Sequence, residues 1–136
     1  MAKLKRCKLD CRQPSDVELA WITGIWEGEG SWGYRKGRKD RKHLNGKIYD
    51  EKPHLRMTLQ MNDKDIMERV ARIMDGRKIT LCTGGKVHKE RGIKPGYILN
   101  LSGVSAVRWT ELMMPHLGKR RLEKYEHIME KINGQT

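Results

Sequence analysis

Residues 20–30 combine a helical pattern with small residues along one side. Ala20, Gly24 and Gly28 recur every four residues, which places them on one face of a helix. A glycine inside a helix costs about 1 kcal/mol relative to alanine, and close packing of a second backbone against this face would offset that cost. We therefore expect two such helices side by side. The alternative is a buried helix that tolerates its glycines.

Two acidic residues, Glu27 and Glu29, stand at the expected end of this helix. Acid at a helix C-terminus is unfavourable because the helix dipole is negative there. Locally unfavourable residues often mark functional sites. The pattern predicts that two paired helices deliver the Glu29 carboxylates to a shared end, whereas the alternative is simply a charged helix terminus.

The chain is strongly basic, with one acidic segment. Its 136 residues include 29 Lys and Arg against 17 Asp and Glu, a formal net charge of +12. This balance predicts a polyanionic partner, with nucleic acid as the first candidate. Residues 13–30 hold four acids and no Lys or Arg. Acids close to phosphate indicate a divalent metal that bridges the two.

We expect a basic N-terminal segment over residues 1–14 and one domain over residues 15–136. This N-terminal segment lacks the apolar stretch of a signal peptide. No apolar run in the sequence nears the roughly 20 residues that cross a bilayer. Cys7, Cys11 and Cys82 form no disulfide framework. These features predict an intracellular protein with no membrane partner. A zinc site at Cys7 and Cys11 is disfavoured, because the C-x₃-C pair has no matching second pair.

Local patterns predict helices and strands in alternation. Ser15 and Glu18 have the spacing of a capping box at the start of the first helix. The expected helices cover about 16–26, 63–75 with Asn62 as the cap, 102–114 and 119–132, and the expected strands cover 30–39, 54–62, 78–83 and 96–101, with a polar loop over 40–53. This order predicts an α+β fold in which four antiparallel strands carry helices on one side.

The strand expected over 54–62 has the clearest alternation. Its odd-numbered positions are apolar, and its even-numbered positions from His54 to Asn62 are polar or basic. One face therefore belongs to the core, and the other is a row of hydrogen-bonding side chains. Such a row could read base edges in a DNA major groove. A solvated outer face is the alternative.

Residues 22–30 resemble the LAGLIDADG motif, which names a family of homing endonucleases. The flanking segments agree with the family pattern over about residues 15–132: Gly30-Ser31 opens a strand, Gln60–Asp65 leads from a strand into a helix, Tyr97-x-Leu99-x-Leu101 precedes a helix, and Pro115–Arg121 resembles the family's P-x-L-x-x-K segment. The resemblance implies an αββαββα fold with a saddle-shaped, four-stranded antiparallel sheet.

The resemblance also implies a homodimer, because the chain contains a single copy of the motif. Ala20, Gly24 and Gly28 would form the interface between the two motif helices. Two-fold symmetry then predicts a palindromic or pseudo-palindromic DNA target. Family enzymes of this type, which are typically intron-encoded, make a double-strand break.

The chemistry that the resemblance implies is metal-dependent hydrolysis of DNA. Glu29 and the Gly28 carbonyl would hold Mg²⁺, with Mn²⁺ as an alternative and Ca²⁺ as a non-catalytic substitute. Asp63 would lie near the metal-bound water. Arg120, with Lys119 as the runner-up, would supply the cation that stabilises the phosphoryl transition state. Glu29 stands where the namesake motif has aspartate.

DNA contacts are expected on the outward strand positions and in the basic loops. The candidates for base contacts are Arg35, Lys39, Arg56, Thr58, Gln60, Thr80, Ile98 and Asn100. The candidates for phosphate contacts are Arg38, Arg41, Lys42, Lys86 and Lys89.

Two other functions remain open at this point. The first is a catalytically inactive DNA- or RNA-binding protein on the same scaffold, such as a maturase or a transcription regulator. The second is an unrelated basic α+β RNA-binding module of ribosomal type. The presence of both Glu27 and Glu29 favours the enzyme over the inactive binding protein. An RNA-binding module of ribosomal type would not explain a small-residue helix face that is followed by two acids.

Overall fold

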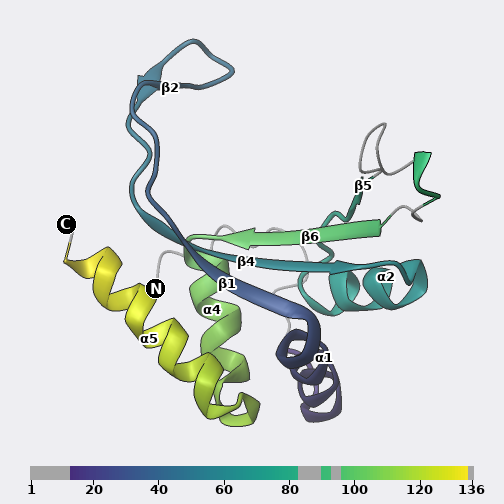
Figure 1. Cartoon of the computed structure of the whole chain (residues 1–136). Coiled ribbons are helices and arrows are strands. Elements are labelled where there is room, and N and C mark those ends of the chain that lie inside the picture. Colours follow the sequence, from purple (N-terminus) through teal and green to yellow (C-terminus); the bar gives the residue numbers. More distant parts are fainter. Residues whose placement is uncertain (1–12, 83–89, 93–95, 135–136) are drawn as a thin grey trace.

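Helices and strands alternate along the chain in the computed structural model, which describes residues 13–82, 90–92 and 96–134 (Figure 1). The elements are α1 Asp16–Glu29, β1 Gly30–Arg35, β2 Arg41–Lys42, β3 Ile48–Tyr49, β4 His54–Met61, α2 Lys64–Ile73, β5 Thr80–Cys82, β6 Gly96–Ser102, α4 Val104–Met113, the 3₁₀ turn η2 Met114–His116, and α5 Lys119–Asn133.

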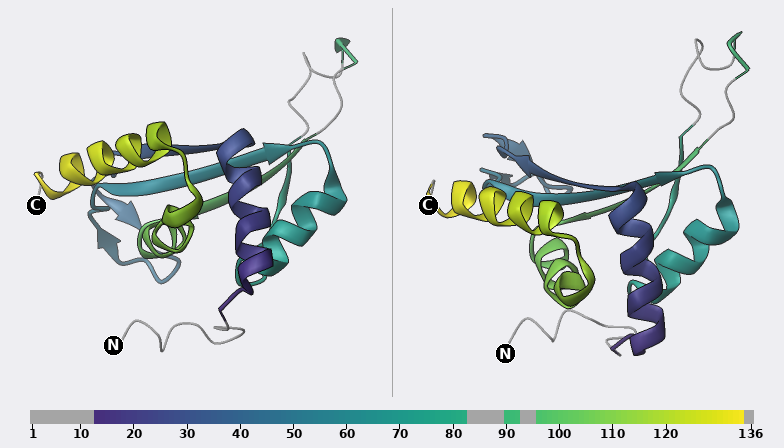
Figure 2. Two further views of the ribbon diagram at one scale, coloured as in Figure 1. Left: turned by 90° about the horizontal axis from the view of Figure 1, so that it is seen from below. Right: turned by 60° about the horizontal axis from the view of Figure 1, so that its bottom comes forward.

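The main sheet has four strands in the order β1-β4-β6-β5, and every neighbouring pair is antiparallel. The helices cover one side of this sheet and leave the other side open (Figure 2). The prediction of an α+β fold with helices on one side of a four-stranded antiparallel sheet is therefore confirmed. Among the described residues, no helix has the length and apolarity needed to cross a membrane.

The core fills the space between the sheet and the helices. Trp32, Met57 and Leu101 are register partners across three strands, and all three are at most 2% exposed. The indole Nε1 of Trp32 donates a hydrogen bond of 2.8 Å to Thr110 Oγ1, and this hydroxyl in turn donates to the Ala106 carbonyl at 2.7 Å. These bonds satisfy the polar atoms buried between β1 and α4.

The first helix begins as its sequence predicts. The Ser15 side chain accepts from the Glu18 N–H, and the Glu18 side chain accepts from the Ser15 N–H, which completes the capping box. The helix continues to Glu29, three residues beyond the expected Trp26. Trp26 is fully buried, so the helix is anchored in the core near the end that carries the acids.

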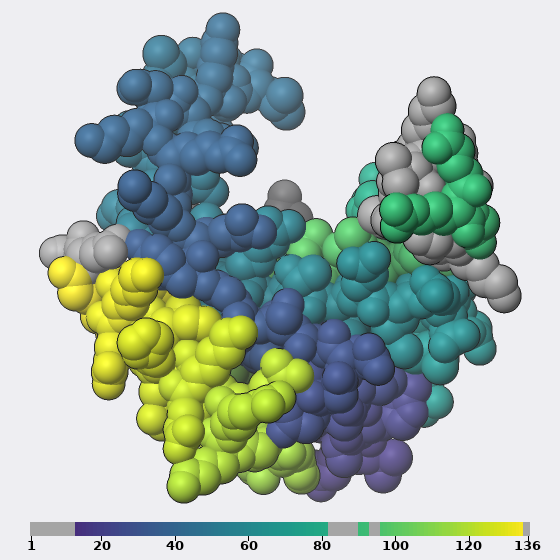
Figure 3. Space-filling model, viewed as in Figure 1, coloured from purple at the N-terminus to yellow at the C-terminus, as the bar shows by residue number. Residues whose placement is uncertain are grey.

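The strand expected over 30–39 ends at Arg35, and the prediction that Lys39 lies on that strand is wrong. Gly37 has a φ of +84°, which breaks the extended backbone. Residues 40–53 were expected to form a loop, but they contain the short antiparallel pair of β2 and β3. We refer to residues 36–53 as the arm, which stands clear of the rest of the molecule (Figure 3).

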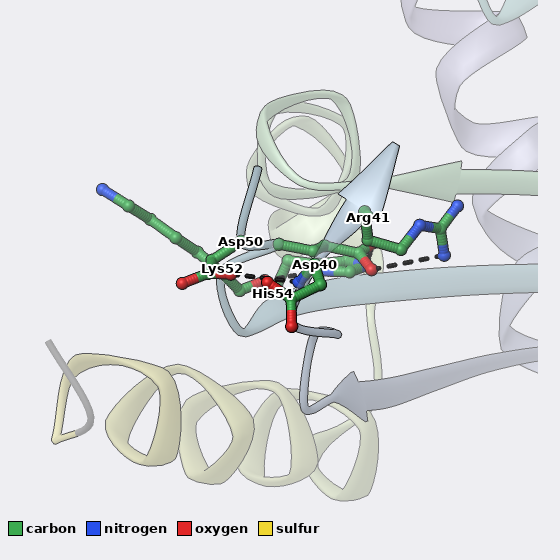
Figure 4. Close-up of polar contacts among 6 residues, drawn as sticks. Asp40, Arg41, Asp50, Lys52 and His54 are labelled. Atoms are coloured by element: carbon green, nitrogen blue, oxygen red, sulfur yellow. Dashed lines mark hydrogen bonds and ion pairs between the residues drawn. The ribbon is translucent and has the colours of Figure 1, made fainter. Parts of the chain in front are cut away.

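The two sides of the arm are joined by polar contacts at its base, some of which are drawn in Figure 4. A Cβ atom at Gly37 would collide with the Glu51 carbonyl oxygen, so only glycine permits this close approach. The Glu51 N–H donates to the Arg38 carbonyl at 2.7 Å, and the Asp40 N–H donates to Asp50 Oδ1 at 3.1 Å. We call these five residues the neck, and they fix how the arm leaves the sheet.

Two helix starts also differ from expectation. The N-cap of α2 is Asp63 rather than Asn62, and Asp63 makes no side-chain capping bond. The helix expected from residue 102 begins at Val104, because β6 continues through Ser102 and Gly103 turns the chain with a φ of +62°. Both corrections move a boundary by one or two residues and leave the predicted layers intact.

Candidate functional site

The open face of the main sheet carries the polar positions of its strands. Because directly paired residues in antiparallel strands share a face, Thr58 lies beside Ser31 and Asn100, and Gln60 lies beside Ile98. Thr80 pairs with Ile98 on the far side, and Arg56 pairs with Gly33 and Ser102. The structure thus brings together, on one surface, the predicted base-contact residues Arg35, Arg56, Thr58, Gln60, Thr80, Ile98 and Asn100.

Hydrogen bonding across this face is sparse, which leaves its side chains available. Thr58 Oγ1 donates to Asn100 Oδ1 at 2.9 Å, and this is a solvent-exposed contact. The Asn100 amide nitrogen is a further donor on this exposed residue. A surface of this kind can offer both donors and acceptors to the edges of bases.

A strongly basic pocket lies where the open face meets the arm. Its cationic residues come from β1, β4 and the arm, and a single carboxylate, Glu51, accompanies them. Arg41 Nη1 lies 3.6 Å from Glu51 Oε2 and His54 Nε2 lies 3.9 Å from Glu51 Oε1, so the four other Lys and Arg side chains of the pocket have no ion pair with this acid. The pocket is lined by Arg35, Lys36, Gly37, Arg38, Arg41, Glu51, His54 and Arg56. This composition suits a phosphate group.

The other predicted basic contacts lie on the arm or outside the described residues. Lys39 is exposed on the arm rather than on β1, and Lys42 is exposed on β2. Lys86 and Lys89 fall outside the described residues, as do Cys7 and Cys11. At the tip of the arm, the rings of His43 and Tyr49 stack with centroids 4.0 Å apart.

A second pocket joins the end of α1 to the start of α2. Glu29 lies on one side of it and Asp63 on the other, with the end of β4 between them. Its lining residues are Glu29, Gln60, Met61, Asn62 and Asp63. Carboxylate and amide oxygens are the hard ligands that Mg²⁺ prefers, so this donor set fits that ion. Within residues 13–82, 90–92 and 96–134, no three His, Cys, Asp or Glu side chains gather closely enough to hold a metal.

Glu27 does not join Glu29 in this pocket. Its Oε1 accepts the N–H of Gly118, and its Oε2 accepts Arg121 Nε at 3.0 Å. Arg121 Nη2 also donates to the Glu27 carbonyl at 2.9 Å. Sequence reasoning missed this link because its partners are 91 and 94 residues away. The available signal was the start of α5, whose N-cap is a glycine with no capping side chain.

The two cations proposed for catalysis lie in the first turn of α5, and both are exposed. Lys119 Nζ is 3.9 Å from Glu123 Oε1, a contact between exposed side chains. Among the described residues, Arg120 has no hydrogen bond or ion pair, and neither cation contacts Glu29. Arg120 is thus the cation that remains unpaired in this turn.

The small-residue face of α1 is exposed. Ala20, Gly24 and Gly28 are all accessible, and Val17 on the same face is 77% exposed. A Cβ atom built on Gly24 or Gly28 would meet nothing within 4 Å. The alternative of a buried helix with tolerated glycines is therefore wrong for this face, because no described part of the chain packs against it.

Solved structures of homing endonucleases have the same arrangement of helices and strands. The complex of I-CvuI with its target in the presence of Ca matches at a TM-score of 0.58 and 13% identity, over 88% of this chain and 69% of that one. The group I intron-encoded I-CeuI complexed with DNA matches at a TM-score of 0.55 and 12% identity, over 95% of this chain and 60% of that one. This chain has the LAGLIDADG homing endonuclease fold.

A second I-CvuI complex, with the I-CreI target in the presence of Mg and with the DNA not cleaved, matches at a TM-score of 0.56 and 13% identity. It covers 83% of this chain, which spans 64% of that protein. No protein-family model and no curated protein sequence matches the chain. The likeness is therefore one of structure, and the LAGLIDADG fold rules out the unrelated ribosomal-type module.

In this LAGLIDADG fold, the motif residues divide into four groups by their surroundings. Gly24 and Gly28 lie on an exposed helix face, and Trp26 is buried in the core. Glu29 lines an open pocket, whereas Glu27 is bonded to the start of α5. This short segment therefore contributes an exposed helix face, a buried side chain in the core, a carboxylate that lines a pocket, and hydrogen bonds between α1 and α5.

Proposed function

We propose that this chain is a homodimeric, site-specific DNA endonuclease that makes a metal-dependent double-strand break. The observation that carries the proposal is a juxtaposition of two surfaces. A basic, hydrogen-bonding sheet face ends at a pocket that contains the Glu29 and Asp63 carboxylates. The first surface suits duplex DNA, and the second suits a divalent cation close to its phosphates.

The exposed small-residue face of α1 supports the homodimer. Gly24 and Gly28 leave room for a backbone to approach, and a second copy of α1 would fill it. Such a contact would place Glu29 of each protomer near a common axis. A dimer of this kind would bind a long palindromic or pseudo-palindromic target.

The residues of the Glu29 pocket have separate roles in the proposed reaction. The Glu29 carboxylate and the Gly28 carbonyl would hold Mg²⁺, or Mn²⁺ in its place, with Ca²⁺ as a non-catalytic substitute. When bound, the metal supplies charge stabilisation and a more acidic water. Asp63 would orient that water, and Arg120 would offset charge that develops on the phosphate, with Lys119 as the second candidate.

Recognition would combine base and phosphate contacts. Arg56 and Gln60 lie on the open face and have the geometry for bidentate contacts to guanine and adenine respectively. Arg38 and Arg41 in the basic pocket would bind a phosphate and set the register on the duplex, whereas Arg35, which also lines that pocket, would contact a base. Thr80, Ile98 and Asn100 would extend the base contacts along the sheet, with Lys39 as a further candidate, and Lys86 would contact a phosphate.

The deciding experiment compares wild type with Glu29→Gln on DNA that carries the uninterrupted insertion locus, in Mg²⁺. Glu126→Gln makes the same chemical change at an exposed position on α5 and serves as the matched control. We expect wild type and Glu126→Gln to cut both strands, and Glu29→Gln to bind in Ca²⁺ without cutting. Tight binding by wild type with no cutting in Mg²⁺ or Mn²⁺ would favour a maturase or a transcription regulator.

The dimer has its own test. Gly24→Leu would place a bulky side chain on the small-residue face, and sedimentation should then report monomers. Glu130→Leu puts the same side chain at an exposed position on α5 and should leave the dimer unchanged. A Gly24→Leu protein that sediments as a dimer and cuts DNA normally would contradict this packing.

A further inference from the structure

Glu27 connects two parts of the molecule that are distant in sequence. It lies near the end of α1, and its carboxylate accepts from the Gly118 N–H and from Arg121 at the start of α5. The Arg121 guanidinium also donates to the Glu27 carbonyl, and it lies 5.6 Å from the centroid of the Trp32 ring. Three hydrogen bonds therefore hold the two helix ends together, and the ring contact joins Arg121 to β1.

The start of α5 needs an acid from elsewhere in the chain. Its N-cap Gly118 has no side chain to accept an N–H, and no Asp or Glu lies in its first turn. That turn contains three cations, Lys119, Arg120 and Arg121, which oppose the positive end of the helix dipole. Glu27 supplies both the missing acceptor and the missing negative charge.

The link acts together with the core packing of Tyr125 and Ile128 to set the rotation of α5 about its axis, and it does so at the end that carries Arg120. Arg121 points inward to Glu27, and its side chain is only 16% exposed. Successive residues on a helix are about 100° apart, so an inward Arg121 places Arg120 to one side of it. Arg120 is exposed and unpaired among the described residues. The bonds that Arg121 makes with Glu27 thus help to set the direction in which Arg120 points, at the first turn of α5.

We propose that Glu27 is a positioning residue for DNA cleavage, which it assists by holding Arg120 in place relative to Glu29. The two acids are two residues apart at the end of one helix, so the part that contributes Glu29 also orients the opposing cation. This inference rests on the proposed endonuclease function. It assigns Glu27 no contact with DNA or metal.

The test is a double-mutant cycle of Glu27→Gln and Arg120→Ala, measured as the single-turnover cleavage rate in Mg²⁺. Each single variant should lower the rate by about 10- to 100-fold, the range that misplacement of a catalytic group produces. DNA affinity in Ca²⁺ should change by less than about 3-fold, because neither change removes a base contact. The double variant should cut no more slowly than the slower single variant, since Glu27 acts through Arg120.

Two further variants complete the design. Glu126→Gln is the matched control on α5 and should cut at the wild-type rate. Arg121→Lys keeps the charge opposite Glu27 but loses the forked geometry of the guanidinium, so it should show the same non-additivity with Arg120→Ala if Glu27→Gln does not fold. Thermal unfolding checks that each variant is folded.

The outcomes separate this inference from the proposed function. Rate losses that multiply in the double variant would overturn the positioning role while wild-type cleavage still supported the endonuclease. A loss of DNA affinity equal to the loss of rate in Glu27→Gln would also overturn it, because the link would then serve binding. An absence of cleavage by wild type, with Glu29→Gln identical to it, would overturn the proposed function first.

Discussion

The two faces of β4 serve different purposes although they alternate along a single strand. Leu55, Met57 and Leu59 are at most 1% exposed and pack under the helices. Arg56 and Thr58, between them, lie on the open face beside residues of β1 and β6. Under the proposed function, the residues of β4 that stabilise the fold and those that contact DNA alternate along the strand, so substitutions should affect folding or DNA binding separately.

The largest expected effect is on the packed face. Leu59→Ala should lower the free energy of unfolding by about 2–5 kcal/mol, because it leaves a cavity in a fully buried site. Gln60→Ala, one residue along on the open face, should change it by no more than about 0.5 kcal/mol. Urea denaturation measures both free energies of unfolding. Similar losses for the two variants would contradict the assignment of stability to the buried face of β4.

A buried hydrogen bond supplies the next largest effect. Thr110→Val removes the acceptor of the Trp32 indole N–H and should cost about 1–3 kcal/mol in unfolding free energy. Thr58→Val removes a hydrogen bond of similar length from the exposed open face, where water can replace it. Thermal and urea unfolding should therefore show a clear loss for Thr110→Val alone, and equal behaviour would refute the role of burial.

The sequence predicted the parts of the fold that depend on near neighbours. The Ser15–Glu18 capping box and the alternation of β4 are local patterns, and both appear in the structure. The arm was missed because strands of two residues have no readable period, and its neck depends on a contact between Gly37 and Glu51. No short pattern indicates such an approach.

The candidate site was predictable to a similar degree. A family resemblance suggested that Glu29 and Asp63 act together, and the structure places them in one pocket. The partners of Glu27 were missed because Gly118 and Arg121 lie 91 and 94 residues away, and the uncapped glycine at the start of α5 indicates only that an acceptor is needed there, without indicating which residue supplies it. Lys39 was misplaced because a strand was extended through the turn at Gly37.

A substitution on the open face should change DNA affinity without changing the free energy of unfolding. Arg56→Ala should weaken binding to the cognate target by about 1–3 kcal/mol and relax specificity at one base. Its unfolding free energy should stay within about 0.5 kcal/mol of wild type. Fluorescence anisotropy in Ca²⁺, on cognate and scrambled duplexes, measures the effect; equal weakening on both duplexes would make Arg56 a phosphate contact.

The basic pocket should contribute in a different way. Arg38→Ala should weaken binding to all sequences alike and reduce the slope of log K against log salt by about 1, because one phosphate contact is lost. Lys124→Ala removes an equal charge from an exposed position on α5 and should leave the slope unchanged. A titration from low to moderate salt distinguishes the two, and a sequence-dependent loss for Arg38→Ala would contradict this assignment.

The smallest effect concerns pH and the packed side of the molecule. Burial, and to a lesser extent the Glu111 carboxylate, raise the pKa of Tyr125 above its ordinary value. As the pH rises, the folded chain therefore keeps the phenol proton to a higher pH than the unfolded chain does. This contribution is complete below about pH 10 and is lost as the pH rises through the raised pKa. Thermal unfolding from about pH 9 to about pH 11 should show a shallower decline for Tyr125→Phe than for wild type.

The neck of the arm has a consequence for how this protein could be re-engineered. Its fastenings, the Gly37–Glu51 approach and the bond from the Glu51 N–H to the Arg38 carbonyl, close the base of the arm with backbone atoms. The segment beyond Arg41 is thus held to the sheet through the neck, and its own two strands pair only with each other among the described residues. Exchanging residues 42–48 for another turn would change how far the arm extends, and it would leave both Arg41 in the basic pocket and the Glu29 pocket in place.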